Sequence, residues 1–245
     1  MCIEVRCGST RLILDAGSGL RALGQQLCVE QEPVDAHLVL SHLHIDHVMG
    51  LTQFAPFWRR DTKVMVHAPG SLVADNPRAS VFSVLYRPLF PVDASELPAS
   101  IGLIEHDAGE TFEPGPGVLV RTFSLSHQGV SRGICVEYAG RKLCYVTDHE
   151  HGDAVTDQAI ASEVKGADLL IYDATFTDAE MPAHRGWGHS SWEEGVRLKR
   201  RAEVKLLALA HHDPDRTDAA LDRLSEKAAR AKNVFFSRQG MELRL

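Results

Sequence analysis

Three histidines and one aspartate stand within six consecutive positions of this chain, directly after a short apolar run at residues 37–40. They are His42, His44, Asp46 and His47. In extended backbone His42 and His44 point the same way, so two imidazoles can share one ion while Asp46 and His47 face a second. Imidazole with carboxylate suits Zn, Mn or Fe, and the lack of thiolates here disfavours a closed structural zinc site. The spacing therefore predicts an open, catalytic metal site.

Two ions need more ligands than this loop supplies, and three further polar residues also follow apolar runs. They are His127 in Ser-Leu-Ser-His, Asp148 in Tyr-Val-Thr-Asp, and His211 in Leu-Ala-Leu-Ala-His. We expect these residues to complete the site. His212, which directly follows His211, is the alternative ligand at that position.

The elements that must position these residues mix strands with helices. Apolar runs and alternation predict strands over residues 3–5, 11–14, 37–40, 64–67, 101–105, 118–125, 132–138, 141–147, 167–172, 206–210 and 234–236. Helical patterns cover residues 20–29, 155–165, 191–203 and 217–232, with a helical turn opening 48–58. Residues 68–100 show no clean period and are predicted to form a loop or lid. No linker is evident, so a single α/β domain over 1–245 is expected.

Composition indicates an ordinary globular protein, with 44% apolar and 24% charged residues and a net charge of -7. No apolar run approaches the roughly 20 residues that cross a bilayer, so we expect no membrane span. No secretory signal is visible at the N-terminus. The five cysteines include no CxxC pair. We therefore expect neither a disulfide framework nor a thiolate zinc site, but small buried cysteines in a cytoplasmic protein.

The ordered set of Leu-Asp15-Ala-Gly, the HxHxDH loop, His127, Asp148 and His211 resembles the metallo-β-lactamase-fold hydrolases, over residues 12 to about 215. The resemblance implies an αββα four-layer sandwich forming one hydrolase domain. It also implies two divalent metal ions, Zn first, with Mn or Fe as alternatives. One ion would be held by His42, His44 and His127. The other would be held by Asp46, His47 and His211, with Asp148 bridging the pair.

Two later segments are similar to the branch that contains ribonuclease Z and the cyclic-phosphate phosphodiesterases. They are residues 172–176, Tyr-Asp-Ala-Thr-Phe, and residues 188–191, Gly-His-Ser-Ser. The resemblance makes His189 a phosphate contact or general acid, and Asp173 a residue that can orient it. It implies a phosphodiesterase that attacks with a hydroxide bridging the ions, with catalytic residues His189, Asp46 and Asp148.

The implied substrate is a small phosphodiester, either a cyclic nucleotide or a cyclic sugar phosphate. The alternative is a hydrolase of lactones, thioesters or β-lactams that uses the same ions. Ribonuclease Z carries a long arm for transfer RNA between its third histidine and bridging aspartate. Here only a strand hairpin separates His127 from Asp148, so transfer RNA is not the expected partner. A homodimer would be usual for this family. Relatives also begin with an extra strand. We therefore expect either that the start of this chain is truncated or that this edge of its sheet differs from theirs.

Several other residues have two interpretations. Asp15 either orients a ligand histidine or merely ends a strand. His184, Arg185 and Trp187 form either a flexible substrate-binding loop or ordinary surface, and residues 149–151 are expected to be solvated rather than to contact substrate.

A dinucleotide loop is conceivable at Gly17-Ser-Gly19-Leu-Arg-Ala22, but the acid required after the next strand is missing. A tight turn is the simpler explanation for these glycines. His37, His67 and His106 match no motif and are expected to be structural. Phe54, Phe57 and Trp58 are expected in the core rather than as a substrate platform.

Overall fold

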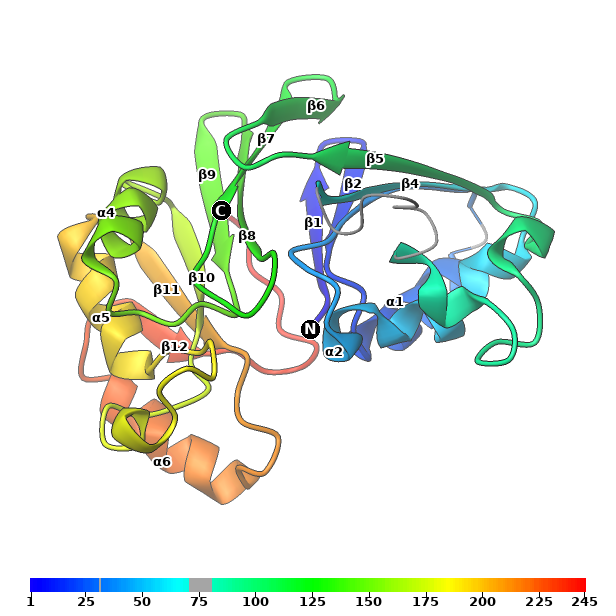
Figure 1. The fold of residues 1–245 in the computed structure, drawn as a ribbon. Helices are drawn as coiled ribbons and strands as arrows, with labels where there is room; N and C mark the ends of the chain where they lie inside the picture. Colours follow the sequence, from blue (N-terminus) through cyan, green and yellow to red (C-terminus); the bar gives the residue numbers. More distant parts are fainter. Residues whose placement is uncertain (31, 71–80) are drawn as a thin grey trace. The chain divides into compact units, whose positions relative to one another are not determined.

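The computed structural model describes residues 1–30, 32–70 and 81–245, which form two compact units. The first unit is Met1–Ala108 with Pro114–Pro116, and the second is Gly109–Glu113 with Gly117–Leu245. Each unit contains one β-sheet with helices (Figure 1). The mixed α/β class is therefore confirmed, whereas the single domain over 1–245 stays a prediction.

The first unit contains a five-stranded sheet in the order β1-β2-β3-β4-β5. Its strands are β1 (Ile3–Cys7), β2 (Thr10–Leu14), β3 (Val34–Val39), β4 (Thr62–Pro69) and β5 (Ser100–His106). Strands β2 to β5 run parallel, and β1 pairs antiparallel with β2. The strands β2, β3 and β4 are buried most completely toward their C-terminal ends, where β2 and β3 lead into the loops that carry Asp15 and His42.

Among the described residues of the first unit, every helix except α1 is short. The helices are α1 (Gly19–Val29), α2 (Ile45–Val48), η1 (Met49–Gln53), η2 (Ala55–Trp58), η3 (Ser83–Leu85) and η4 (Ala94–Glu96). Leu20 and Leu27 of α1 join the same buried cluster as Leu38 and Val66 of the sheet. This cluster fixes the strand that leads into the histidine loop.

Between residues 82 and 99, the segment predicted as a loop or lid contains the 3-10 helices η3 and η4 joined by turns, and residues 71–80 lie outside the described part. Its aromatic residues Phe82 and Phe90 are buried in the core of the first unit. The described portion is therefore a covering layer of the fold rather than an exposed lid.

The second unit contains a seven-stranded sheet in the order β12-β11-β10-β9-β8-β7-β6. Its strands are β6 (Thr111–Gly115), β7 (Val118–Ser124), β8 (Arg132–Tyr138), β9 (Arg141–Val146), β10 (Leu169–Asp173), β11 (Leu206–Ala210) and β12 (Val234–Phe236). Strands β7, β8 and β9 pair antiparallel, and β9 to β12 pair parallel. The sheet thus changes from hairpins to crossover connections at β9.

Helices provide the crossovers in the second unit. They are α4 (Ala154–Glu163), η5 (Met181–Ala183), α5 (Trp192–Arg201) and α6 (Asp218–Ala228). Helix α5 begins at a serine cap, because the Ser191 side chain accepts from the Glu194 N–H. Among the described residues, no helix is long and apolar enough to cross a bilayer.

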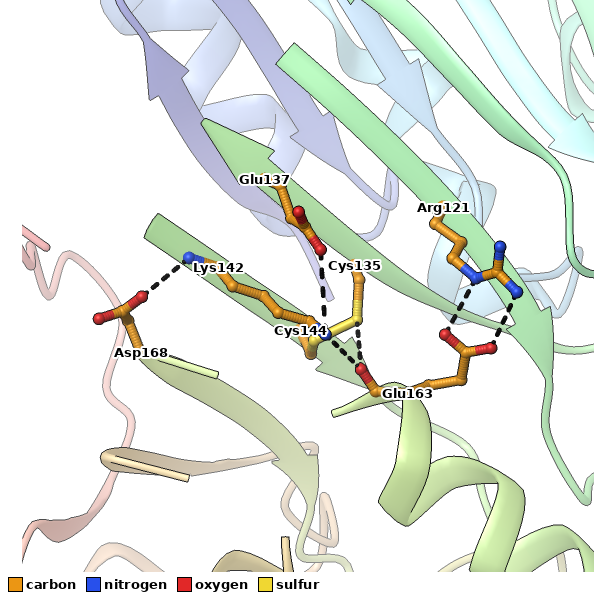
Figure 2. Close-up of a disulfide and its surroundings, with 7 residues drawn as sticks. All are labelled: Arg121, Cys135, Glu137, Lys142, Cys144, Glu163 and Asp168. Carbon is orange, nitrogen blue, oxygen red and sulfur yellow. Dashed lines mark hydrogen bonds and ion pairs between the residues drawn. A yellow bond between two sulfur atoms is a disulfide. The ribbon is translucent and has the colours of Figure 1, made fainter. Parts of the chain in front are cut away.

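The cysteine prediction is wrong at two positions, because Cys135 and Cys144 form a disulfide between β8 and β9 (Figure 2). The two residues are directly opposite in the antiparallel register, with Cα atoms 4.2 Å apart. That spacing is typical of a non-hydrogen-bonded pair, in which opposite side chains come closest. Disulfides are rare in the cytosol, so cysteine usage no longer supports the predicted cytoplasmic location.

Beside the disulfide, the C-terminal end of α4 is fastened to the sheet. Lys142 donates from Nζ to the Glu163 carbonyl oxygen at 2.6 Å (Figure 2). The Glu163 carboxylate in turn accepts two hydrogen bonds from the Arg121 guanidinium, at 3.0 and 3.1 Å. A cation at the last carbonyls of a helix also complements the helix dipole.

Three histidines that match no motif form a row across the sheet of the first unit. His67 lies between His37 and His106, with ring nitrogens 2.9 Å and 2.8 Å apart respectively. The rings stack with centroids 5.2 Å and 5.1 Å apart. Burial, helped by its two histidine neighbours, lowers the pKa of His67 to about 3. We call this row the histidine ladder.

Candidate metal centre

The histidine loop of the first unit connects the end of β3 to the start of α2. His44 immediately precedes the helix, and Asp46 and His47 lie within its single turn. The ring of His42 lies 4.6 Å from that of His44 and 4.2 Å from that of His47, centroid to centroid. The loop therefore gathers its imidazoles as the spacing predicts. We call His42, His44, Asp46 and His47 the loop group.

Asp15 fixes the orientation of this loop. It follows β2 with a left-handed backbone (φ 60), which is uncommon for a residue other than glycine. Its carboxylate accepts from the Ser41 N–H at 2.7 Å, from the Ser41 hydroxyl at 2.8 Å and from His47 Nδ1 at 2.7 Å. Although burial acts to raise it, the pKa of Asp15 is lowered because His47 lies beside it. The contacts match the interpretation that Asp15 orients a ligand histidine.

These hydrogen bonds also select the tautomers of the imidazoles. A carboxylate only accepts, so His47 carries its proton on Nδ1. The Ser41 hydroxyl donates to Asp15, so its oxygen accepts from His42 Nδ1 at 3.0 Å. In both rings Nε2 is left with the lone pair, which is the form that binds a metal ion.

Close backbone contacts explain the glycine at position 17. A Cβ on Gly17 would lie 2.1 Å from the Asp46 carbonyl oxygen and 2.3 Å from the N-terminal nitrogen. The Gly17 N–H donates to the Met1 carbonyl oxygen. Gly17 therefore lets the turn after β2 pack against the histidine loop, which agrees with the tight-turn explanation.

The remaining predicted ligands lie in the second unit, each in a loop beside a strand end. His127 lies between β7 and β8, Asp148 follows β9, and His211 follows β11. Asp148 Oδ2 is 3.5 Å from His127 Nε2, and Asp148 Oδ1 is 3.1 Å from His211 Nε2. Asp148 and His211 have left-handed backbone (φ 52 and 55), like Asp15. We call His127, Asp148 and His211 the strand-end group.

The tautomers of the strand-end histidines are set by neutral acceptors. His127 donates from Nδ1 to the Gly188 carbonyl oxygen at 2.8 Å. The Thr175 hydroxyl donates to the His211 carbonyl at 2.8 Å, so its oxygen accepts from His211 Nδ1 at 3.1 Å. The Nε2 lone pairs therefore face the oxygens of Asp148. Two acceptors in contact repel each other, and a cation among them removes the repulsion, so these residues fit a metal ion.

His189 adjoins the strand-end group. It donates from Nδ1 to Asp173 Oδ2 at 2.9 Å, and the same oxygen accepts the Asp148 N–H at 3.1 Å. The His189 ring stacks on that of His211, with centroids 5.2 Å apart. Asp148, Asp173, His189 and His211 each offer one potential ligand atom, all within 4.8 Å of one another. The contacts match the predicted pairing of Asp173 with His189.

The structure separates His211 from its alternative. His212 turns away from Asp148, stacks on Phe236 with centroids 5.0 Å apart, and contacts the Ser237 carbonyl oxygen. Of the aromatics after the loop, Phe54 and Phe57 are buried as predicted, but Trp58 is 52% exposed.

The solvated-loop prediction for residues 149–151 is wrong at His149, which is buried and contacts Asp157. The prediction also missed Glu150, whose two oxygens accept from the N–H groups of Gly186 and Gly188 at 3.0 and 2.8 Å. Glu150 thus holds the segment that supplies the carbonyl partner of His127. No local pattern marks this role, because the residues are more than thirty positions apart.

The chain was compared with known proteins. A family model described as "Beta-lactamase superfamily domain" matches residues 10–212. A ribonuclease Z from Haloarcula marismortui is 26% identical over an alignment of 255 positions. The alignment covers 85% of this chain and 80% of the relative.

Two solved structures share the fold. The metallo-beta-lactamase fold protein YhfI from Bacillus subtilis aligns with a TM-score of 0.72 at 17% identity, over 98% of this chain and 89% of YhfI. Zn(2+)-bound PqqB from Methylobacterium extorquens aligns with a TM-score of 0.71 at 18% identity, over 100% of this chain and 87% of PqqB. These likenesses confirm the predicted metallo-β-lactamase fold.

Proposed function

This chain belongs to the beta-lactamase superfamily and is a metal-dependent hydrolase, and from that premise we propose that it is a dinuclear phosphodiesterase. Its substrate would be a small phosphodiester, either a cyclic nucleotide or a cyclic sugar phosphate. The observation that carries the proposal is His189, held by a buried aspartate beside the strand-end group.

The loop group and the strand-end group would together hold two divalent ions, with His42, His44 and His127 on one and Asp46, His47 and His211 on the other. Asp148 would bridge them. Zn is the first choice, and Mn or Fe also suit nitrogen and oxygen ligands. Two such ions lower the pKa of water toward about 7 and neutralise the charge that grows on phosphoryl oxygens. Four of these histidines have the Nδ1–H tautomer that the role requires.

His189 would supply the proton to the departing alkoxide. Asp173 accepts its Nδ1 hydrogen bond, which leaves Nε2 as the nitrogen that can face the substrate. A well-placed general acid contributes roughly 10²–10⁴-fold to the rate. Attack on a carbonyl compound has less need of a separate acid histidine at this place. This difference favours phosphodiesters over lactones, thioesters and β-lactams.

A substrate panel on metal-loaded protein tests the proposal. The panel contains bis(p-nitrophenyl) phosphate, cyclic nucleotides, a lactone and nitrocefin, and elemental analysis measures the metal content. We expect turnover of the phosphodiesters. Turnover of the lactone alone would contradict the proposal.

The role of His189 is tested with His189→Ala. Metal content should persist, while turnover of a phosphodiester with an alkoxide leaving group falls roughly 10²–10⁴-fold. Nitrophenolate needs little protonation, so its release should fall less. Equal losses for both leaving groups would instead indicate that His189 binds the phosphate.

Processing of precursor transfer RNA is the second candidate, because the matched relative is named ribonuclease Z. The hairpin of β8 and β9 lies between His127 and Asp148, where ribonuclease Z carries its arm for transfer RNA, which favours the small substrate. A precursor transfer RNA with a 3′ trailer, added to the same panel, separates the two. Trailer cleavage at rates far above those for cyclic nucleotides would favour the second candidate.

A further inference from the structure

Trp187 lies close to His189 in sequence, and its side chain is 59% exposed. Single exposed apolar residues are ordinary on protein surfaces, so exposure alone indicates no ligand. Trp58 is exposed to a similar extent, at 52%, and packs against Phe90. The two tryptophans therefore provide a comparison in which only the surroundings differ.

The backbone around Trp187 is fastened on both sides. Gly186 and Gly188 both have left-handed backbone (φ 83 and 80), and both donate to the Glu150 carboxylate. Although partial burial acts to raise it, the pKa of Glu150 is lowered because these N–H groups stabilise its charge. Gln128 donates from its side-chain amide to the Gly186 carbonyl oxygen. The loop thus presents an exposed indole from a backbone held by hydrogen bonds, and it is not the flexible loop that was one of the two interpretations.

An aromatic cluster connects this indole with His189. Trp187 meets His184 edge to face, with centroids 4.9 Å apart, and His184 stacks on Phe176 at 4.2 Å. Phe176 is buried, and its ring lies 6.1 Å from that of His189. A ring bound on Trp187 would therefore lie on the same aromatic cluster that supports His189.

The polar neighbours of Trp187 suit a heterocycle joined to a phosphate better than an alkyl group. The Arg185 side chain is 55% exposed, and its guanidinium donates to the His151 carbonyl oxygen at 2.9 Å. Guanidinium groups recognise phosphate through charged hydrogen bonds. Any nucleobase can stack on an aromatic side chain, because every base has a π-face.

We propose that Trp187 is a stacking platform for the nucleobase of a nucleoside phosphodiester whose scissile phosphate lies at His189. This inference rests on the proposed phosphodiesterase function and defines its substrate class. Within that class it favours cyclic nucleotides over cyclic sugar phosphates that lack a base.

Steady-state kinetics on two matched substrates tests the platform. The substrates are adenosine 2′,3′-cyclic phosphate and methyl riboside 2,3-cyclic phosphate, which lacks the base. Trp187→Ala should lower kcat/KM for the adenosine substrate about 5- to 150-fold, the equivalent of about 1–3 kcal/mol of stacking. Trp187→Ala should hydrolyse the base-free substrate at the wild-type rate. Trp187→Phe should keep most of the rate on the adenosine substrate. Trp58→Ala should leave the rates on both substrates unchanged. Equal losses on both substrates, or no loss on either, would overturn the platform.

A binding measurement tests the platform without turnover. AMP should quench the tryptophan fluorescence of the wild-type protein, Trp187→Phe should lose that quenching, and ribose 5-phosphate should quench neither protein. If the wild-type protein hydrolyses neither cyclic phosphate, the phosphodiesterase proposal fails, and the platform is judged by AMP alone. Quenching by AMP that persists in Trp187→Phe would overturn it.

Discussion

The loop group and the strand-end group hold imidazoles in the same tautomer by different means. In the loop group, the buried Asp15 carboxylate holds His47 directly and His42 through Ser41. In the strand-end group, a backbone carbonyl holds His127 and a threonine hydroxyl holds His211. A charged acceptor holds an imidazole about twice as strongly as a neutral one and makes it a more basic ligand. The same Nδ1–H tautomer therefore depends on a charged acceptor in the first unit and on neutral acceptors in the second.

Removal of the proposed bridging residue should have the largest effect. Asp148→Ala should lose at least one metal ion and nearly all activity, because His127 and His211 both face its carboxylate. Even partners outside the ligand set typically cost 10–100-fold, so we expect a loss greater than about 100-fold. Elemental analysis and turnover measure the change, with the exposed Asp215→Ala as the matched control. Unchanged metal content in Asp148→Ala would show that the bridging assignment is wrong.

The difference between charged and neutral support is sharpened by two nearly isosteric variants. Asp15→Asn keeps the shape but removes the charge beside His47, and Thr175→Val removes the hydroxyl beside His211. We expect metal affinity to fall about 10- to 100-fold for Asp15→Asn and less for Thr175→Val. Competition with a chelator measures both dissociation constants. A larger loss for Thr175→Val would reverse the ranking.

Backbone placement in the second unit can be broken at a glycine. A Cβ on Gly188 would lie 2.1 Å from His127 Nδ1, whereas a Cβ on Gly186 meets nothing within 4 Å. Both residues have left-handed backbone, so alanine costs about 1 kcal/mol of strain at either position. Only Gly188→Ala should also displace His127 and lower metal affinity, by about tenfold. Equal metal binding by the two variants would mean that the carbonyl of Gly188 does not position His127.

A smaller effect is expected from acid. Lowering the pH should gradually decrease the stability of the first unit, which contains the histidine ladder. The pKa of His67 is lowered from 6.5 to about 3 in the folded protein. Between these two pH values, His67 binds a proton in the unfolded chain but not in the folded protein. Stability that is present above pH 6.5 is therefore lost as the pH falls, by up to about 1.4 kcal/mol per pH unit.

Urea unfolding between pH 6.5 and 5.5 measures this slope, above the range in which most carboxylates take up protons. His67→Gln should flatten it. An unchanged slope in that variant would assign the acid sensitivity to other groups.

Local patterns predicted much of the fold and all of the loop group. The strands β11 and β12 have the predicted bounds, because their apolar runs end at clear polar residues. Strand β6 was missed because it contains Pro114 and Gly115, which weaken any strand pattern and are tolerated at a sheet edge. The strand-end group was nominated because each residue follows an apolar run, but only the family resemblance assigned each one to an ion, since three separate strand ends carry no common spacing.

The disulfide shows a prediction that was within reach of the sequence. A hairpin of residues 132–138 and 141–147 was predicted, and its turn residues Ala139 and Gly140 both have the positive φ values (49 and 74) of a tight hairpin turn. A two-residue turn pairs Tyr138 with Arg141 and therefore sets Cys135 opposite Cys144. The role of Glu150 was beyond reach, because it depends on how two distant loops meet.

The left-handed residues at Asp15, Asp148 and His211 limit how far this protein can be made heat-resistant without harm. Glycine would adopt the same backbone with about 1 kcal/mol less strain at each position, but it has no side chain to offer. Laboratory evolution for thermal tolerance alone would be drawn to Asp148 and His211, whereas glycine at position 15 would leave the donors of Ser41 and His47 without their buried acceptor. Evolution under selection for turnover would keep all three left-handed residues.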